Sequence, residues 1–263
     1  MSGSDHAPIV EMKDIEKHFG PVIALNGVSF DVRPGECHCL LGDNGAGKST
    51  FIKTMSGVHK PTSGEILFEG RQMHFDSPRD AMEAGIATVY QDLAMIPLMS
   101  VTRNFWMGRE PIRKLGPLKL MDFATANAVT MEEMRRMGIN LRSPDQAVGT
   151  LSGGERQTVA IARAVHFGAK VLILDEPTSA LGVRQTANVL ATIDKVRKTG
   201  IGIVFITHNV RHALAVGDRF TVLNRGRTLG TAQRGQITPE ELQDMMAGGQ
   251  EMVALESSLG GTV

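Results

Sequence analysis

The sequence predicts an α/β fold built on a mostly parallel β-sheet, because short apolar runs alternate with helical patterns. The runs 171–174 and 201–206 are typical of strands that are buried on both faces. A helical pattern over 183–198 lies between them. The chain of 263 residues is long enough for one large domain, or for a domain that carries an inserted subdomain.

Near the N-terminus, two further strand-like runs lie beside turn signals. The run 28–32 ends at a turn with the sequence Arg33-Pro34-Gly35, and the run 65–68 follows a turn over 61–64. We expect these runs to form an antiparallel β segment next to the parallel sheet.

A glycine-rich loop lies between a predicted strand over 36–41 and a predicted helix over 50–56, and it fits the pattern G-x-x-x-x-G-K-[ST]. Its glycines let the backbone approach a phosphate closely, and its N–H groups point inward at the positive end of the helix. Lys48 would add a charge near the β- and γ-phosphates, and the Ser49 hydroxyl would bind Mg²⁺. The loop therefore predicts a P-loop NTPase (RecA-like) core with a nucleoside triphosphate bound by Gly42, Asp43, Asn44, Gly45, Ala46, Gly47, Lys48, Ser49 and Thr50.

A pair of carboxylates follows the apolar strand 171–174, at the edge of the sheet where ligands bind in open α/β folds. Asp175 could hold Mg²⁺ through its water shell, and Glu176 could polarise an attacking water. An acidic helix cap is the simpler alternative for these two residues taken alone. The phosphate loop favours the catalytic interpretation.

A second glycine-rich segment has the sequence Leu151-Ser152-Gly153-Gly154-Glu155. Its composition suits a contact with the terminal phosphate of a nucleotide from the opposite side. We do not expect one small domain to fold both loops around the same nucleotide. The two loops together therefore predict that two copies of the chain close around shared ATP.

The middle of the chain has little strand signal and many methionines, which we interpret as an inserted helical subdomain. The predicted organisation is a first part of the core over 1–92, the helical subdomain over 93–157, a second part of the core over 158–247 and a flexible tail over 248–263. No internal repeat is visible, so we expect one nucleotide-binding unit per chain.

Composition excludes several other classes of protein. The 28 basic residues balance 28 acidic ones, so the sequence has no electrostatic footprint for nucleic acid. No apolar run approaches the roughly 18 residues that cross a bilayer, and the N-terminus lacks the features of a signal peptide. We therefore expect a cytoplasmic protein. We interpret Cys37 and Cys39 as reduced core cysteines that face opposite sides of their strand.

Five motifs occur in the order found in ATP-binding cassette (ABC) ATPases, and the chain resembles that family from Ile9 to Gly230. The motifs are the phosphate loop, Gln91 after an aromatic strand end, the Leu-Ser-Gly-Gly-Glu segment, the strand ending in Asp175-Glu176, and His208. The Leu-Ser-Gly-Gly sequence is highly specific to the family. The resemblance implies ATP and Mg²⁺ as cofactors.

The resemblance also implies roles for single residues. Phe19 would stack on adenine, with core packing as the alternative. Gln91 would contact Mg²⁺ and the attacking water, and His208 would bind the γ-phosphate and orient Glu176. The segment Ser152, Gly153 and Gly154 would contact the γ-phosphate held by the other subunit. The implied catalytic residues are Glu176, His208 and Gln91, and the implied metal-binding residues are Ser49, Gln91 and Asp175.

One position departs from the family pattern. The family continues Ser-Ala-Leu-Asp after the Asp-Glu strand, whereas this chain has Ser179-Ala180-Leu181-Gly182. The missing carboxylate would reach toward the partner's phosphate loop. Coupling between two ATP sites would then be weaker or would follow another route.

The stretches 75–81 and 84–91 resemble bacterial importers of ribose, xylose, fructose and related monosaccharides. The resemblance implies an ATP-hydrolysing importer subunit for a monosaccharide or polyol, on the inner face of the cell membrane. Its partners would be a second ATPase subunit, either another copy in a head-to-tail homodimer or a different ATPase chain, together with an integral membrane permease and, indirectly, a periplasmic sugar-binding protein, with no nucleic acid.

Three alternatives remain open: a soluble ABC-type mechanical ATPase, the ATPase subunit of an exporter, and a regulatory ATP-binding subunit with no transport role. Chromosome-type members of the first class need a long coiled coil after the phosphate loop, and the segment 57–150 is too short and too broken by proline and glycine for one. The importer-like stretch 75–91 argues against an exporter.

Overall fold

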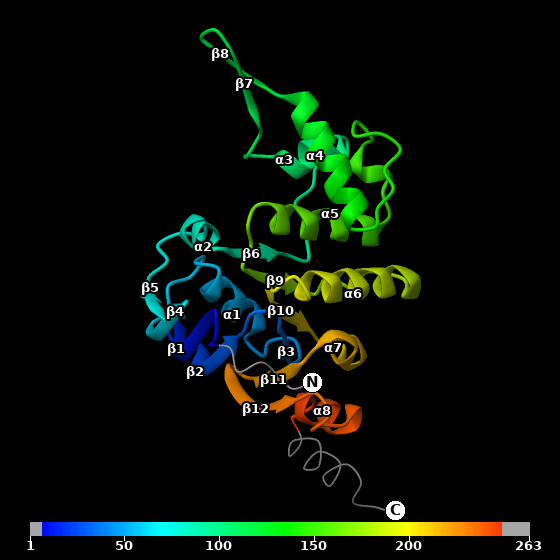
Figure 1. Ribbon diagram of the computed structural model, residues 1–263. Coiled ribbons are helices and arrows are strands. Elements are labelled where there is room, and N and C mark those ends of the chain that lie inside the picture. Colours follow the sequence, from blue (N-terminus) through cyan, green and yellow to red (C-terminus); the bar gives the residue numbers. More distant parts are fainter. Residues whose placement is uncertain (1–6, 249–263) are drawn as a thin grey trace, which may run out of the picture.

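A computed structural model describes residues 7–248 of the chain. Its lower body in Figure 1 contains the two larger β-sheets, and a group of helices with a projecting hairpin lies above them. Apart from residue 248, the predicted tail over 248–263 lies outside the described residues.

The main sheet has six strands in the order β12-β11-β3-β10-β9-β6. Every neighbouring pair is parallel except β11 and β12, so the predicted, mostly parallel sheet is confirmed. The apolar runs that predicted strands form β9 and β10, which are interior strands of this sheet and pair with each other. The strands are β3 (Cys37–Leu41), β6 (Ile86–Val89), β9 (Val171–Asp175), β10 (Gly202–Thr207), β11 (Arg219–Asn224) and β12 (Arg227–Gln233).

The expected antiparallel segment is also present, as a four-stranded sheet in the order β2-β1-β4-β5. Its strands are β1 (Val10–Phe19), β2 (Val22–Val32), β4 (Ser63–Phe68) and β5 (Arg71–Met73). Helix α1 (Lys48–Met55) lies between the two sheets (Figure 1) and contributes Phe51 and Ile52 to one buried apolar cluster with both of them. This packing places the N-terminus of α1 at the end of β3.

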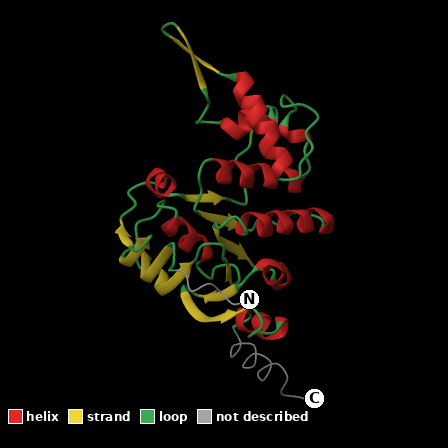
Figure 2. Ribbon diagram, viewed as in Figure 1, coloured by secondary structure: helices red, strands yellow, loops and turns green. Residues whose placement is uncertain are grey.

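The opposite face of the main sheet packs against helices (Figure 2). These helices are α6 (Val183–Arg197), α7 (Val210–Val216) and α8 (Pro239–Met246), and α2 (Pro78–Ala84) precedes β6. Cys37 and Cys39 are free, buried and part of the same apolar cluster on this face. The prediction that they face opposite sides of β3 is wrong, because residues two apart on a strand share a face.

A third apolar cluster lies in the upper group of helices. It joins α3 (Val101–Trp106), α4 (Phe123–Arg136) and α5 (Gly153–His166), and a short 3₁₀ turn, η1 (Val148–Thr150), precedes α5. The expected helical character holds for these elements. The segment also contains an antiparallel hairpin that was not expected, formed by β7 (Ile112–Leu115) and β8 (Leu118–Met121).

The subdomain boundary expected at 157 falls inside α5, and the boundaries themselves stay predictions. Across residues 7–248, no helix combines the length and the hydropathy that crossing a bilayer requires.

Candidate functional site

The predicted phosphate loop connects β3 to α1 and is shaped by glycines. Gly42, Gly45 and Gly47 have φ values of 149°, 85° and 105°, which L side chains rarely adopt. A Cβ atom on Gly42 would lie 2.4 Å from the backbone oxygen of Leu223. Helix α1 has no side chain that caps its N-terminus, so its first N–H groups stay open to an anion. The loop therefore fits a phosphate group.

Lys48, the first residue of α1, turns its side chain back over the loop. Its side chain is buried, and Nζ donates to the backbone oxygens of Gly42 at 2.5 Å and Asp43 at 3.0 Å. Burial lowers the pKa of Lys48, and the charges of Glu176, Asp43 and Asp175 oppose that shift. The ammonium group thus lies between the loop and the carboxylates at the end of β9.

The two predicted carboxylates lie at the C-terminal edge of the main sheet. Asp175 ends β9, and the Glu176 N–H donates to the backbone oxygen of Ile206 in β10 at 3.0 Å. Burial raises the pKa of Asp175, as does the neighbouring charge of Glu176, whereas Lys48 lowers it. Glu176 has a φ of 47°, a strained backbone conformation of the kind that clusters at functional sites.

Both oxygens of the Glu176 carboxylate are hydrogen-bonded to residues at the end of β10. His208 lies 2.8 Å from Oε1 through Nδ1 and donates its backbone N–H to the same oxygen at 3.0 Å. The hydroxyl of Thr207 donates to Oε2 at 3.2 Å. The structure thus brings the predicted pair Glu176 and His208 together. Sequence reasoning missed Thr207, because one threonine at a strand end carries no signal.

The three residues expected to bind Mg²⁺ offer oxygen atoms, which are the ligands that this ion prefers. Within residues 7–248, no group of three or more His, Cys, Asp or Glu side chains could hold a metal. Mg²⁺ keeps several waters and is commonly bound by one or two protein carboxylates together with substrate phosphates. The Ser49 hydroxyl lies on α1, directly after the phosphate loop, and the Asp175 carboxylate lies at the end of β9, so together they suit this mode of binding.

Phe19, at the end of β1, is 43% exposed, which excludes the core-packing alternative. The His59 ring lies edge-on at 5.2 Å between centroids, and Lys17 Nζ lies 5.1 Å from the ring centroid of Phe19. These neighbours leave an aromatic surface that a flat base could cover.

The second glycine-rich segment forms the start of α5. Ser152 is the N-cap, and it exchanges hydrogen bonds with Glu155 at 2.8 and 3.3 Å in a capping box. The helix therefore begins at Gly153. Figure 1 shows α5 above β6 and β9, whereas α1 lies lower in the view, between the two larger sheets, so the two glycine-rich segments are separated in the fold.

Gly182, which replaces the family's aspartate, is the N-cap of α6, with φ of −68° and ψ of 162°. No atom lies within 4 Å of where its Cβ would be. The backbone angles and the surrounding space at this position would therefore accommodate an aspartate side chain.

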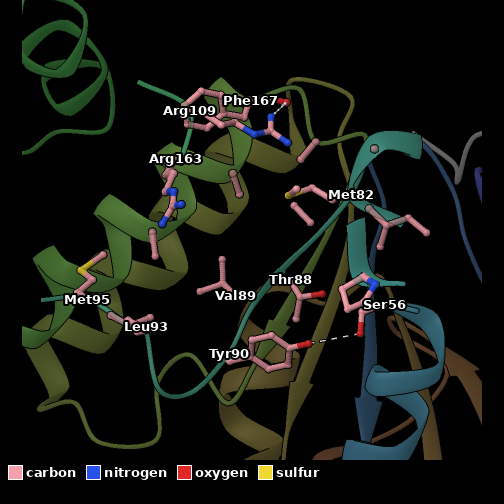
Figure 3. A pocket seen from close by; sticks show the side chains of 18 of the residues that line it. Ser56, Met82, Thr88, Val89, Tyr90, Leu93, Met95, Arg109, Arg163 and Phe167 are labelled. Atoms are coloured by element: carbon pink, nitrogen blue, oxygen red, sulfur yellow. Dashed lines mark hydrogen bonds between the residues drawn. The ribbon is translucent and has the colours of Figure 1, made fainter. Parts of the chain in front are cut away.

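A cavity of about 330 Å³ lies between β6 and α5 (Figure 3). Val89, Tyr90 and Leu93 line one side, and Gln91 is an exposed residue between the lining residues Tyr90 and Asp92. Across the cavity lie Arg109 and Arg163, which sequence reasoning did not identify. Burial and the charge of Arg109 lower the pKa of Arg163, whose side chain donates to the backbone oxygen of Met107 at 2.8 Å.

The chain is similar to known proteins in sequence and in fold. A family profile described as ABC transporter matches residues 25–179. The chain is 43% identical over 242 residues to the "Xylose/arabinose import ATP-binding protein XylG" of Sulfolobus acidocaldarius, covering 90% of this chain and 93% of that protein. It is also 43% identical over 249 residues to the "Fructose import ATP-binding protein FrcA" of Rhizobium meliloti, covering 93% and 95%.

The chain spans 48% of a third relative, the "Ribose import ATP-binding protein RbsA 2" of Streptomyces avermitilis, at 39% identity and with 94% of this chain covered. Among solved structures, the fold matches the ADP conformation of the ATP-binding cassette MJ1267 with a TM-score of 0.78 and 24% identity, covering 92% of this chain and 95% of that one. It matches cbiO1 from Clostridium perfringens with a TM-score of 0.73 and 25% identity, covering 96% of both chains.

Proposed function

Because the chain belongs to the ABC transporter family, we propose that it binds and hydrolyses ATP to power a sugar importer. The substrate class is a monosaccharide or polyol, as the names of the xylose, fructose and ribose relatives suggest. The observation that carries the proposal is the position of Glu176. It lies at the sheet edge beside the phosphate loop, and its carboxylate is hydrogen-bonded to His208.

Hydrolysis follows from the groups around the phosphate loop. The loop's N–H groups and Lys48 hold the β- and γ-phosphates, and Phe19 stacks on the base. Glu176 polarises a water for attack on the γ-phosphate. Ser49, Gln91 and Asp175 would hold Mg²⁺, which when bound would supply positive charge beside the phosphates.

His208 and Thr207 donate hydrogen bonds to both oxygens of the Glu176 carboxylate. A carboxylate oxygen can accept two hydrogen bonds. Oε2 accepts one from the Thr207 hydroxyl, so it keeps a lone pair for the attacking water. If the His208 ring turned to the γ-phosphate, the His208 backbone N–H would still hold Oε1 and keep the carboxylate oriented.

A second copy of the chain completes the site in this proposal. The segment 152–154 starts a helix, and its N–H groups can bind an anion. It lies apart from the phosphate loop of its own chain (Figure 1), so it would meet the γ-phosphate of a second chain in a head-to-tail homodimer.

The permease would dock in the cavity between β6 and α5. Apolar side chains line it, including Met82 and Met95, and methionine packs well against surfaces that change shape. Gln91, between two lining residues, would report the nucleotide state to the permease. This arrangement puts the chain on the inner face of the membrane, with a periplasmic binding protein delivering the sugar on the other side.

The test is uptake of labelled xylose, arabinose, ribose, fructose and a polyol by cells that make the unaltered chain or the Glu176→Gln variant. We expect the variant to abolish uptake of one or a few of these compounds. Export of a substrate that depends on Glu176, with all uptake unchanged, would show an exporter. Unchanged transport in both directions would favour the soluble mechanical ATPase.

A further inference from the structure

The hairpin β7–β8 projects from the upper group of helices and ends at a turn over Gly116 and Pro117 (Figure 1). Its base is closed by a hydrogen bond from the Asp122 N–H to the Pro111 oxygen at 2.7 Å. An isolated two-stranded hairpin is marginally stable in water. The hairpin is thus an extended element that receives little stabilisation from contacts with the rest of the chain.

Large apolar side chains on this hairpin lie in solvent. Ile112, Leu118 and Leu120 are 60%, 59% and 52% exposed. Leu118 directly follows the turn, and Leu120 lies two residues on, so the two share a face of β8. The outer end of the hairpin therefore presents apolar surface without a partner in the described part of the chain.

The hairpin is also positively charged. Residues 112–121 contain Arg113, Lys114 and Lys119 and no acidic residue. Lys114 and Lys119 lie directly opposite each other across the two strands, a pairing of like charges that destabilises a hairpin. Neither lysine forms an ion pair with a residue in 7–248. A nearby anionic surface would relieve this repulsion.

The hairpin starts beside the cavity in which the permease is proposed to dock. Arg109 lines that cavity, and β7 begins three residues later at Ile112. An element that starts there projects from the side of the molecule on which the permease, and hence the bilayer, would lie. This placement rests on the proposed function.

We propose that the hairpin β7–β8 inserts its apolar end into the headgroup region of an anionic bilayer, with Lys114 and Lys119 contacting lipid phosphates. An anionic lipid surface is opposite in charge to the basic hairpin, whereas the cytoplasmic loops of a permease are of the same charge. Cytoplasmic loops of membrane proteins carry an excess of lysine and arginine, which would repel this hairpin. The cytoplasmic leaflet is negatively charged and attracts basic segments.

The test is flotation of the purified full chain with vesicles of phosphatidylcholine alone and of phosphatidylcholine mixed with phosphatidylglycerol. We expect binding to the mixed vesicles only, and weaker binding as the salt concentration rises. The variant Lys114→Gln/Lys119→Gln should bind about 25-fold more weakly, from about fivefold for each charge removed. Leu118→Ser should weaken binding by about tenfold through lost apolar contact.

The matched control is Lys13→Gln/Lys198→Gln, which removes two exposed lysines far along the chain from the hairpin. It should bind the mixed vesicles as the unaltered chain does. Equal loss of binding in the control would show general charge attraction and overturn the proposal. Unchanged binding in the hairpin variants would overturn it as well.

A protein partner is the other outcome to separate. In that case the chain would not bind the mixed vesicles but would bind vesicles of phosphatidylcholine that contain the permease, and the hairpin variants would lose this binding. This result would show that the hairpin contacts the permease and that the lipid proposal is wrong. ATP hydrolysis is measured on the same preparations. Normal hydrolysis without lipid binding refutes only this inference, whereas absence of hydrolysis in the unaltered chain refutes the proposed function.

Discussion

At the scale of single residues, Lys48 offers a direct test of the phosphate loop. Its ammonium group donates to two oxygens of the loop, and in the ATP complex it would donate to phosphate instead. Charge-assisted hydrogen bonds are worth about 1.5–3 kcal/mol each. We expect Lys48→Ala to weaken ATP binding by at least about tenfold, measured by calorimetry.

Lys53 supplies the control for that measurement. It is an exposed lysine on the same helix, and its ammonium group forms no hydrogen bond or ion pair with a residue in 7–248. Lys53→Ala should change ATP affinity far less than Lys48→Ala. Equal losses in the two variants would mean that general charge, rather than the loop geometry, determines affinity.

His38 in β3 makes stability depend on pH. Its ring is buried, stacks on Phe30 at 3.9 Å between centroids, and donates through Nδ1 to the Asp31 oxygen. Nε2 then accepts the Thr221 hydroxyl at 2.8 Å. Burial lowers the pKa from 6.5 to about 3. In the folded protein the His38 ring therefore stays neutral over a pH range in which the same ring takes up a proton in the unfolded protein.

Because the unfolded state binds more protons between these two pKa values, stability falls as pH falls through 6.5. We expect His38 to remove about 1.4 kcal/mol of unfolding free energy between about pH 7.5 and about pH 5.5, measured by urea unfolding. His38→Gln should be less stable at neutral pH but should lose this part of the pH dependence. An unchanged slope in the variant would rule out His38 as the source.

The residues of the site were predictable to different degrees. Lys48, Asp175 and Glu176 followed from a glycine-rich loop and an apolar strand that ends in two carboxylates. The orientation of the His208 side chain toward Glu176 came only from the family resemblance. Thr207 and Arg163 act through neighbours that are distant in sequence, so no local pattern could single them out.

At the scale of elements, α6 begins at a residue that has no side chain to hydrogen-bond its first turn. Gly182 has backbone angles that any residue adopts and open space around its Cβ position. Aspartate is among the best N-cap residues and also restricts the unfolded chain more than glycine does. We expect Gly182→Asp to stabilise the protein by about 0.5–1 kcal/mol, measured by urea unfolding.

Gly200, past the other end of α6, is the matched control. It too has no atom within 4 Å of its Cβ position, but its φ is 95°. Gly200→Asp should therefore destabilise the protein, since the backbone conformation disfavours any side chain. Stabilisation by both substitutions would contradict the capping argument.

Helices and central strands were predicted well where periodicity was strong, as in α6 and in β9 and β10. The hairpin β7–β8 escaped prediction because leucine and lysine are typical of helices and its strands are only four residues each. The Gly-Pro pair at its turn was the one available signal. The start of α5 could have been read from the Ser152 to Glu155 spacing of a capping box.

At the scale of the whole molecule, the separation of the two glycine-rich segments predicts an ATP-dependent dimer. Glu176→Gln should bind ATP normally, hydrolyse it at least about 100-fold more slowly and accumulate as a dimer in size-exclusion chromatography. A variant that hydrolyses ATP at the normal rate would remove Glu176 as the base.

A second substitution tests which surface closes that dimer. Ser152→Asp keeps a residue that can cap α5 but brings a negative charge toward the partner's γ-phosphate. Combined with Glu176→Gln, it should leave monomer stability and ATP binding intact and prevent the ATP-dependent dimer. A dimer that persists would show that the segment 152–154 does not face the nucleotide.

Helix α5 has one further consequence for how such a dimer could act on a permease. Its first turn carries the segment expected at the nucleotide, and Arg163, near its last turn, lines the cavity expected at the permease. The helix has 14 residues and so spans about 21 Å. An unbroken helix transmits displacement along its length as a rigid lever, so movement at the phosphate would reach the membrane partner without any change of fold in between.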